Sequence, residues 1–278
     1  MNPVDKLLAA YLAFVTVMAA ARGGLDEPTT WWIVLAHALF GLLLYLFTRL
    51  TPENRAGQFI HDLYPLLLLP ALYTEIGLVN EVFGIDRVFQ NDALVQRWEA
   101  ALFGGQVSYT WIRTFPSVFW SGLLHVAYVS YYPIVYLGPI ILVFRGRRDR
   151  ARRVLLATMT AYVVCYVVFI AFPVAGPNWV FDHPTGPVRD VWSARMVYAL
   201  LAGGSSVGAA FPSSHVAATM AAVAALWWEW RTLFAVFVVP ATLMTIATVY
   251  CQMHYAIDAT LGLLIGVGSA GVARRIKP

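Results

Sequence analysis

Eight long apolar stretches constrain this chain more than any other feature of its sequence. Each is close to the roughly 20 apolar residues that an α-helix needs to cross a bilayer. They are residues 7–21, 31–47, 63–79, 118–144, 154–172, 212–228, 232–250 and 254–273. Because the bilayer interior offers the backbone no hydrogen-bond partner, such stretches cross it as helices. The sequence therefore predicts an all-α, polytopic membrane protein, a bundle of about eight transmembrane helices with six as a possible core.

The composition excludes several other classes of protein. Of the 278 residues, 60% are apolar and 12% are charged, and the mean hydropathy is +0.67. Soluble domains average roughly 45–50% apolar and about 25% charged residues. The two cysteines, Cys165 and Cys251, allow one disulfide at most. A disordered chain, a disulfide-rich scaffold and a soluble globular enzyme are therefore excluded.

The basic residues predict the orientation of the helices. The net charge is +4, and six arginines fall within residues 145–153. Such a run can bind nucleic acid, but this one joins two apolar stretches, and cytoplasmic loops are enriched in lysine and arginine. We therefore expect a cytoplasmic loop and no nucleic-acid partner. With eight crossings, the basic residues on the same side are Lys6, Arg49, Arg55, the run itself, Arg231, Arg274, Arg275 and Lys277. Both termini are then expected to be cytoplasmic.

The predicted organisation is a single integral membrane domain over residues 1–278. Residues 1–117 hold the N-terminal spans and an interfacial segment, because residues 91–103 alternate polar and apolar side chains at helical spacing. Residues 154–272 hold the predicted catalytic core, since the two motifs described next both lie there.

Ionisable side chains inside the apolar stretches are the candidates for function, because burying them in a bilayer costs free energy. They are His37, Asp62, Glu75, His125, His215, His254 and Asp258. We expect the first four to find partners between helices or near an interface. The last three fall into two motifs whose spacing suits catalysis.

The first motif, Phe-Pro-Ser-Ser-His at residues 211–215, opens the sixth apolar stretch. Pro212 is expected at the first helical position, because the missing N–H of proline would have no partner there. The free N–H groups of that turn, with the hydroxyls of Ser213 and Ser214, form a predicted anion site. His215 lies one turn further along and could exchange a proton with a bound substrate.

The second motif, His-Tyr-Ala-Ile-Asp at residues 254–258, opens the eighth apolar stretch. A spacing of four places His254 and Asp258 on one helix face. The carboxylate can then accept a hydrogen bond from one imidazole nitrogen and leave the other as an oriented nucleophile or base. The sixth and eighth stretches cross in the same direction, so His215 and His254 are expected at the same, non-cytoplasmic, surface.

Taken together, the two motifs are similar to a known family. Pro-Ser-x-His followed about forty residues later by His-x-x-x-Asp resembles the type 2 phosphatidic acid phosphatase superfamily. The longer strings at residues 210–216 and 254–258, with the Pro-rich segment 172–179, resemble the branch of inositol phosphorylceramide synthases and, more distantly, sphingomyelin synthases. The resemblance covers residues 154–272.

The resemblance implies a role for each matching residue. His254 would attack phosphorus and form a phosphohistidine, and Asp258 would orient it. His215 would protonate the leaving alcohol and then deprotonate the acceptor, while Ser213 and nearby backbone amides hold the phosphoryl oxygens. The resemblance implies no metal and no cofactor, since amides and protonated groups can stabilise the developing charge.

The chain also departs from the phosphatase members of that family. Those members carry Lys-x6-Arg-Pro upstream and Ser-Arg before the last histidine, whereas this chain has no Arg-Pro and has Ala247 and Thr248 at the latter positions. Such cations balance a dianionic phosphate monoester, so their absence favours a phosphodiester. Arg113, Arg189 or Arg195 could restore the charge from the outer loops. Two aromatic residues complete the candidates: Trp179 for a lipid entry and Tyr255 for a head-group contact.

The expected function is a membrane-embedded phosphotransferase that moves a phospho-head-group from a phospholipid to a lipid alcohol through a phosphohistidine. Its partners are then those two lipids and the bilayer. One alternative is a lipid phosphate phosphatase that hydrolyses phosphatidic acid-type or polyprenyl phosphate monoesters. A more remote alternative is a transporter or flippase, although the sequence shows none of the internal symmetry that transporters often have.

Overall fold

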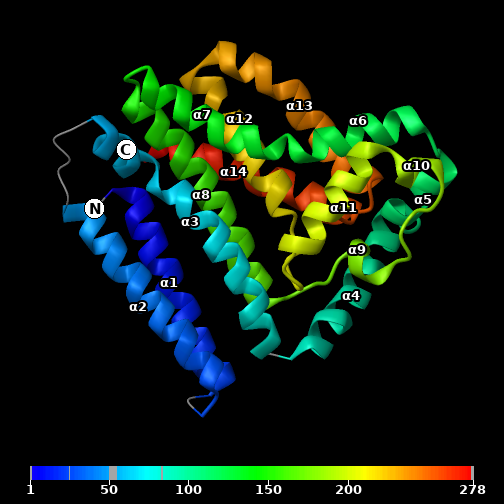
Figure 1. Cartoon of the computed structure of the whole chain (residues 1–278), viewed down its shortest axis with the longest axis horizontal. Helices are drawn as coiled ribbons and strands as arrows, with labels where there is room; N and C mark the ends of the chain where they lie inside the picture. Colours follow the sequence, from blue (N-terminus) through cyan, green and yellow to red (C-terminus); the bar gives the residue numbers. More distant parts are fainter. Residues whose placement is uncertain (1, 25, 50–54, 83, 277–278) are drawn as a thin grey trace.

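The structure is a computed structural model and describes residues 2–24, 26–49, 55–82 and 84–276. These residues fold almost entirely into α-helices (Figure 1). The helices are α1 (Pro3–Gly23), α2 (Pro28–Arg49), α3 (Arg55–Val82), α4 (Ile85–Phe103), α5 (Val107–Thr114), α6 (Val118–Val129), α7 (Tyr131–Phe144), α8 (Arg148–Ala171), α9 (Pro177–Val180), α10 (Pro187–Asp190), α11 (Trp192–Gly204), α12 (Ser214–Glu229), α13 (Arg231–Tyr250) and α14 (Ala256–Arg275). The predicted all-α architecture is confirmed. Two basic residues used for the orientation, Lys277 and the side chain of Arg55, lie outside the described part.

Seven of the described helical segments are long and apolar enough to cross a membrane: α1, α2, α3, the consecutive pair α6–α7, α8, α13 and α14. The sixth predicted span is α12, which has only 16 residues. Its length of about 24 Å is less than the roughly 30 Å of a bilayer core. Most of its side chains are buried by neighbouring helices, so α12 lies inside the bundle rather than against lipid. The seven long apolar segments indicate that the chain is an integral membrane protein.

The centre of the bundle is the group α8, α12 and α14, which pack against one another. Small residues allow a close approach of α12 and α14. A Cβ atom added to Gly262 of α14 would lie 2.5 Å from the carbonyl oxygen of Ser213 and 3.2 Å from the Cβ of Val216. Glycine at such a crossing lets two backbones nearly touch. As a result, the N-terminal ends of α12 and α14 lie side by side. His215 lies in the first turn of α12, and His254 lies just before α14.

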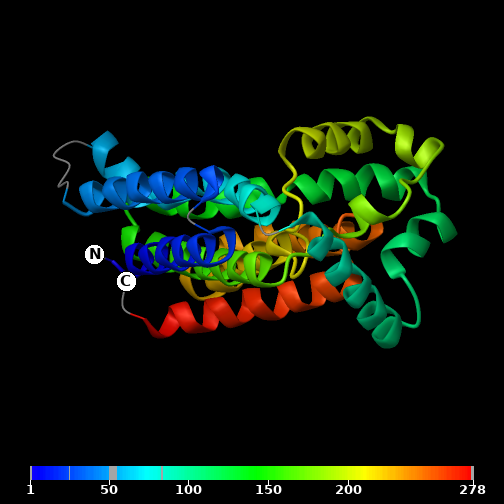
Figure 2. The same cartoon turned by 90° about the horizontal axis from the view of Figure 1, so that it is seen from below.

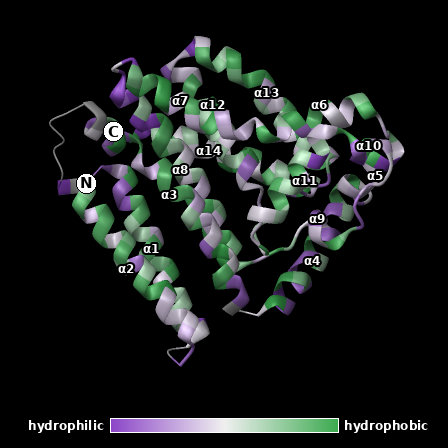
Figure 3. Cartoon of the chain, in the orientation of Figure 1, coloured by the Kyte–Doolittle hydropathy of each residue, from purple (hydrophilic) through white to green (hydrophobic). Residues whose placement is uncertain are grey.

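The remaining helices surround this centre. α1 and α2 form an antiparallel pair at one edge of the molecule (Figure 1); α1 packs directly on α8, and α3 contacts α1, α2 and α8. The two termini lie near each other, and α4, α5, α9, α10 and α11 gather at the other end (Figures 1 and 2). Hydrophobic residues run along the outer helices (Figure 3). On α2 the exposed large ones include Trp31, Trp32, Leu35, Leu39 and Leu42, a face suited to lipid.

The ionisable residues that we expected to be paired between helices do have partners. His37 of α2 contacts the carboxylate of Glu75 on α3. Asp62 of α3 lies 3.1 Å from Arg148 Nε and 3.1 Å from Arg152 Nη2 on α8. The Nδ1 atom of His125 lies 2.7 Å from the carbonyl oxygen of Ser121, one turn earlier on α6. The contacts of His37 and Asp62 join two helices, whereas that of His125 stays within α6, and all three residues lie outside the site described next.

Candidate active site

The structure brings the two motif histidines into direct contact. His215 lies in the first turn of α12, and His254 lies two residues before α14. The Nε2 atom of His254 is 3.4 Å from the Nδ1 atom of His215. This contact follows from the close crossing of α12 and α14, since both histidines stand at the start of their helices.

The orientation of His254 depends on its other nitrogen. Nδ1 lies 3.0 Å from the carbonyl oxygen of Ala210 and 3.6 Å from Oδ2 of Asp258. A carbonyl oxygen can only accept, so Nδ1 carries the proton and Nε2 presents a lone pair toward His215. Asp258 was expected to accept this hydrogen bond, but its Oδ2 accepts the backbone N–H of Tyr255 at 2.9 Å. The structure thus places the carbonyl of Ala210 as the hydrogen-bond acceptor of His254 and the carboxyl group of Asp258 as a neighbour of the ring.

The first turn of α12 differs from the prediction. The helix begins at Ser214, with Ser213 as its N-cap, and the cis peptide bond Phe211–Pro212 precedes it. The prediction that Pro212 opens the helix is therefore wrong, because serine is the stronger N-cap. The Oγ atom of Ser213 accepts the N–H of Val216 at 3.3 Å, so this hydroxyl caps the helix. Ser214 lines a cavity beside His215.

Helix α4 holds the start of α14 through two buried carboxylates. Glu99 accepts the N–H groups of Ala256 at 3.1 Å and Ile257 at 2.9 Å. Burial raises the pKa of the Glu99 carboxyl above its ordinary value, while these N–H bonds act to lower it. Asp92 accepts the hydroxyl of Tyr255 at 2.8 Å. Tyr255 is therefore buried against α4 and does not line the two cavities beside the histidines that are described below, which leaves its predicted head-group contact without support.

Asp92 also fixes the Pro-rich segment. Its Oδ1 atom accepts the N–H of Gly176 at 2.7 Å, just before α9. Residues 91–103 were expected to lie at the membrane interface, and nothing in their pattern indicated a contact with the histidine motifs. The alternating pattern showed a polar face, but it could not show that Asp92 and Glu99 would bind backbone N–H groups of distant segments.

The three arginines that were expected to restore the positive charge do not contact the histidines. Arg113 donates to Gln252 Oε1 at 2.7 Å and to the carbonyl oxygen of Asp182 at 2.5 Å. Gln252 has a φ of 61°, which is uncommon for a residue other than glycine, and its side-chain amide donates to the same carbonyl at 3.0 Å. Arg189 stacks on Tyr198 at 3.2 Å, and Arg195 is exposed. Arg113 therefore braces the loop before His254.

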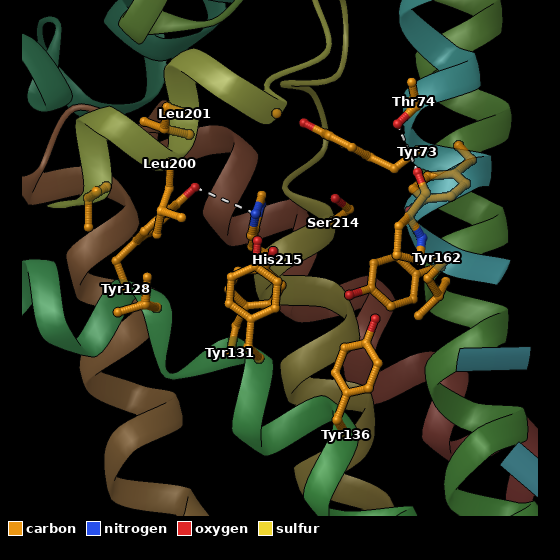
Figure 4. Close-up of a pocket in the computed structure, with 17 residues that line it drawn as sticks. Tyr73, Thr74, Tyr128, Tyr131, Tyr136, Tyr162, Leu200, Leu201, Ser214 and His215 are labelled. Carbon is orange, nitrogen blue, oxygen red and sulfur yellow. Dashed lines mark hydrogen bonds between the residues drawn. The ribbon is translucent and has the colours of Figure 1, made fainter. Parts of the chain in front are cut away.

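Two cavities meet at His215. The smaller, of about 40 Å³, is lined by both histidines together with Asn178, Trp179 and other residues. The larger, of about 280 Å³, contains His215 and seven tyrosines (Figure 4): Tyr73, Tyr128, Tyr131, Tyr132, Tyr136, Tyr162 and Tyr166. Tyr73, Tyr128, Leu201 and His215 line both cavities. No lysine, arginine, aspartate or glutamate is among the described residues that line them.

The tyrosines also determine the surroundings of His215. The hydroxyl of Tyr128 lies 3.5 Å from His215 Nε2, and the ring of Tyr131 meets the imidazole edge-on at 4.4 Å between centroids. Motif spacing could not identify these residues, because they belong to α6 and α7. Within the described residues, no group of three or more histidine, cysteine, aspartate or glutamate side chains is placed to hold a metal ion.

Comparison with known proteins places this architecture in a family. The family model of the PAP2 superfamily matches residues 93–272. The match begins in α4 and ends in α14, so it includes both histidines and the tyrosines of α6 and α7, and it extends beyond the region of resemblance noticed in the sequence. No curated protein and no solved structure was found to match the chain. Because the match covers well over half of the 278 residues, the chain belongs to the PAP2 superfamily, whose activities are of the phosphatase or phosphotransferase type.

Proposed function

We propose that this protein is a phosphotransferase that moves a phospho-head-group from a phospholipid to a lipid alcohol, in the manner of the inositol phosphorylceramide synthases. The observation that carries the proposal is the pair of imidazoles at 3.4 Å, set at a cavity that no charged side chain lines among the described residues. Superfamily membership supports phosphoryl chemistry of this general kind.

In the first half-reaction, Nε2 of His254 attacks phosphorus. A P–N bond forms as the bond between phosphorus and the lipid-alcohol oxygen breaks, and His215 gives its proton to that oxygen. The phosphoryl group takes the place of the direct contact between the two rings. Because Nδ1 of His254 keeps its proton and donates it in a hydrogen bond to the carbonyl oxygen of Ala210, the phosphorylated ring carries a positive charge. Asp258, at 3.6 Å, stabilises that charge.

In the second half-reaction, the hydroxyl group of an acceptor takes the position of the departed alcohol. His215, now neutral, accepts the hydroxyl proton as the acceptor oxygen attacks phosphorus. A new P–O bond forms and the P–N bond breaks, which restores His254. The protons and the phosphoryl group balance over the cycle, and one histidine serves as acid and then as base.

The charge of the site supports a phosphodiester donor. A phosphate monoester carries up to two negative charges, and a cluster of cations usually balances them. A phosphodiester carries one. Arg113 and Arg189 contact Gln252 and Tyr198 instead, so the hydrogen-bond donors that line the cavities are neutral groups such as Asn178, Trp179 and the tyrosine hydroxyls.

One observation favours a phosphatase as the second candidate. The smaller cavity has room for water, since about 40 Å³ exceeds the roughly 10–15 Å³ that one water requires. Trp179, which lines it, is 47% exposed. Water that enters beside His215 could replace the acceptor alcohol and release free phosphate from a monoester.

Analysis of the products formed by the purified protein in detergent distinguishes a phosphotransferase from a phosphatase. Phosphatidic acid is supplied alone, and phosphatidylinositol is supplied with ceramide or diacylglycerol. We expect a new phosphodiester lipid from the second mixture, and none from His254→Ala at unchanged folding. His183→Ala is the control, because His183 is exposed in the outer loop and lines neither cavity. Phosphate release from phosphatidic acid alone would instead make the protein a phosphatase, and turnover retained by His254→Ala would overturn the mechanism.

A further inference from the structure

Helix α3 lies outside the matched part of the superfamily but is attached to the candidate site. It ends at Val82, whereas the match begins at residue 93. The Asn80 side chain donates to the carbonyl oxygen of Val207 at 3.2 Å, and the Ser206 hydroxyl donates to the carbonyl oxygen of Tyr73 at 2.9 Å. These bonds join α3 to the loop that leads into the first histidine motif.

The same helix forms one wall of the larger cavity, through Leu69, Pro70, Tyr73 and Thr74. Pro70 has no N–H, so the carbonyl of Leu66 loses its helical partner. The hydroxyl of Tyr136 on α7 donates to that carbonyl at 3.3 Å. The carbonyl group left unpaired by Pro70 thus accepts a hydrogen bond from Tyr136, a tyrosine that lines the cavity.

Because His215 lines both cavities, its place indicates which part of the substrate each cavity would hold. His254 lines only the smaller one, and His215 lines both. The phosphorus must lie beside His254, and the alcohol oxygen that exchanges a proton must lie beside His215. The alcohol therefore extends into the larger cavity, which His215 lines (Figure 4) and His254 does not.

The larger cavity opens at the side of the bundle. Five of its lining residues are also exposed, and they come from three helices: Pro70 and Thr74 of α3, Tyr132 of α7, and Leu200 and Gly204 of α11. Because α3 and α7 belong to membrane-spanning segments, this opening faces lipid. A volume of about 280 Å³ is at the lower end of ligand pockets, so it suits the polar start of a lipid with its chains outside.

We propose that the tyrosine-lined cavity binds the alcohol part of the lipid substrate, and that α3 with α7 and α11 forms the opening through which its chains extend into the bilayer. The tyrosine hydroxyls meet the ester, amide or hydroxyl oxygens next to the reacting group, and their rings pack on the first methylenes. This inference rests on the proposed function, since it takes His215 as the group next to the alcohol oxygen. It gives the N-terminal helices a role in selecting substrate.

A tryptophan scan at the opening tests the inference. Thr74→Trp and Leu200→Trp narrow the opening. Their controls are Leu78→Trp on α3 and Ala199→Trp on α11, which are also exposed but line neither cavity. Turnover is measured with dioleoyl and with dibutanoyl forms of phosphatidylinositol and of phosphatidic acid. We expect the ratio of kcat/KM for the long chains to that for the short chains to fall at least tenfold in Thr74→Trp and Leu200→Trp, and to stay within twofold of wild type in the controls.

Photo-crosslinking separates this inference from the proposed chemistry. A diacylglycerol with a diazirine near its ester groups is irradiated with the protein in nanodiscs, beside a phosphatidylcholine carrying the same diazirine. We expect diacylglycerol-specific crosslinks in peptides of α3, α7 and α11, reduced at least fivefold by Leu200→Trp. An unchanged chain-length ratio, or crosslinks identical for the two lipids, would overturn the inference even if His254 is essential. Specific crosslinks with full turnover in His254→Ala would instead uphold the cavity and reject the chemistry.

Discussion

At the scale of single residues, the site depends on which atom faces each nitrogen of His254. The His254–Asp258 spacing predicts a carboxylate on the same helix face; His254 in fact lies two residues before α14, yet Oδ2 of Asp258 is 3.6 Å from its Nδ1 atom. The hydrogen-bond acceptor is nevertheless the carbonyl of Ala210, and a backbone carbonyl leaves no signal in a sequence. In the proposed mechanism Asp258 therefore acts on charge more than on ring orientation, and this determines the expected effect of replacing it.

We expect Asp258→Asn to lower kcat about tenfold, equivalent to about 1.4 kcal/mol of transition-state stabilisation. The ring keeps its bond to Ala210, but the positive charge of the phosphohistidine loses its neighbour. Steady-state kinetics on the purified variant measure the effect, with Asp190→Asn in exposed α10 as control. Turnover equal to wild type would mean that Asp258 serves only the backbone N–H of Tyr255.

At the scale of elements, α4 shows how a surface pattern can hide an internal contact. Its polar face suited an interfacial helix, yet Asp92 and Glu99 are buried and bind N–H groups of the segments that carry the site. Each carboxylate replaces a partner that those backbone groups lack at a helix start or in a turn. The contacts join residues more than 80 positions apart, so only the folded chain reveals them.

The raised pKa of Glu99 predicts a pH effect on stability. Between the ordinary carboxyl pKa and the raised one, the folded protein binds more protons than the unfolded chain, so the free energy of unfolding falls as pH rises. We expect the unfolding midpoint of wild type, taken relative to Glu99→Gln, to decrease from pH 4 to pH 8 in thermal denaturation in detergent. Asp86→Asn, at an exposed position of α4, should follow wild type. A constant difference between wild type and Glu99→Gln would contradict the assignment.

The crossing of α12 and α14 makes a second prediction for elements. Gly262→Ala places a Cβ against the carbonyl of Ser213, so we expect a loss of about 1–3 kcal/mol in stability and a larger loss of turnover as the histidines separate. Gly268→Ala, on the same helix with open space at its Cβ, should be neutral or stabilising by up to about 1 kcal/mol. Thermal unfolding and steady-state kinetics of the two variants test this prediction. Equal stability and equal turnover in the two variants would show that α12 and α14 do not cross closely at Gly262.

At the scale of the whole molecule, the two histidines lie at the N-terminal ends of α12 and α14, whereas the C-terminal end of α14 lies beside the two chain termini (Figure 2). The bias of the basic residues indicates that the termini are cytoplasmic. We therefore propose that the site opens on the non-cytoplasmic side, where a lipid head group could be exchanged in the outer leaflet.

Cysteine labelling checks this orientation. Both native cysteines are buried, so the background is low. Thr185→Cys lies at an exposed position between α9 and α10, and Asp149→Cys lies at an exposed position in the first turn of α8, within the arginine-rich segment. We expect a membrane-impermeant maleimide to label the first in intact cells and the second only after permeabilisation. The reverse order would invert the topology.

The sequence by itself determined the class of the protein and indicated which side chains form the candidate site. Apolar length indicates membrane helices because a bilayer has a set thickness, and the spacing within each of the two motifs indicates which side chains lie close together at the start of a helix. Tertiary structure decided what surrounds them. The carbonyl of Ala210, the carboxylates of α4 and the tyrosines of α3, α6, α7 and α8 reach the site only through packing between segments distant in the chain. Such packing depends on side-chain shape across helices, which periodicity along one helix does not encode.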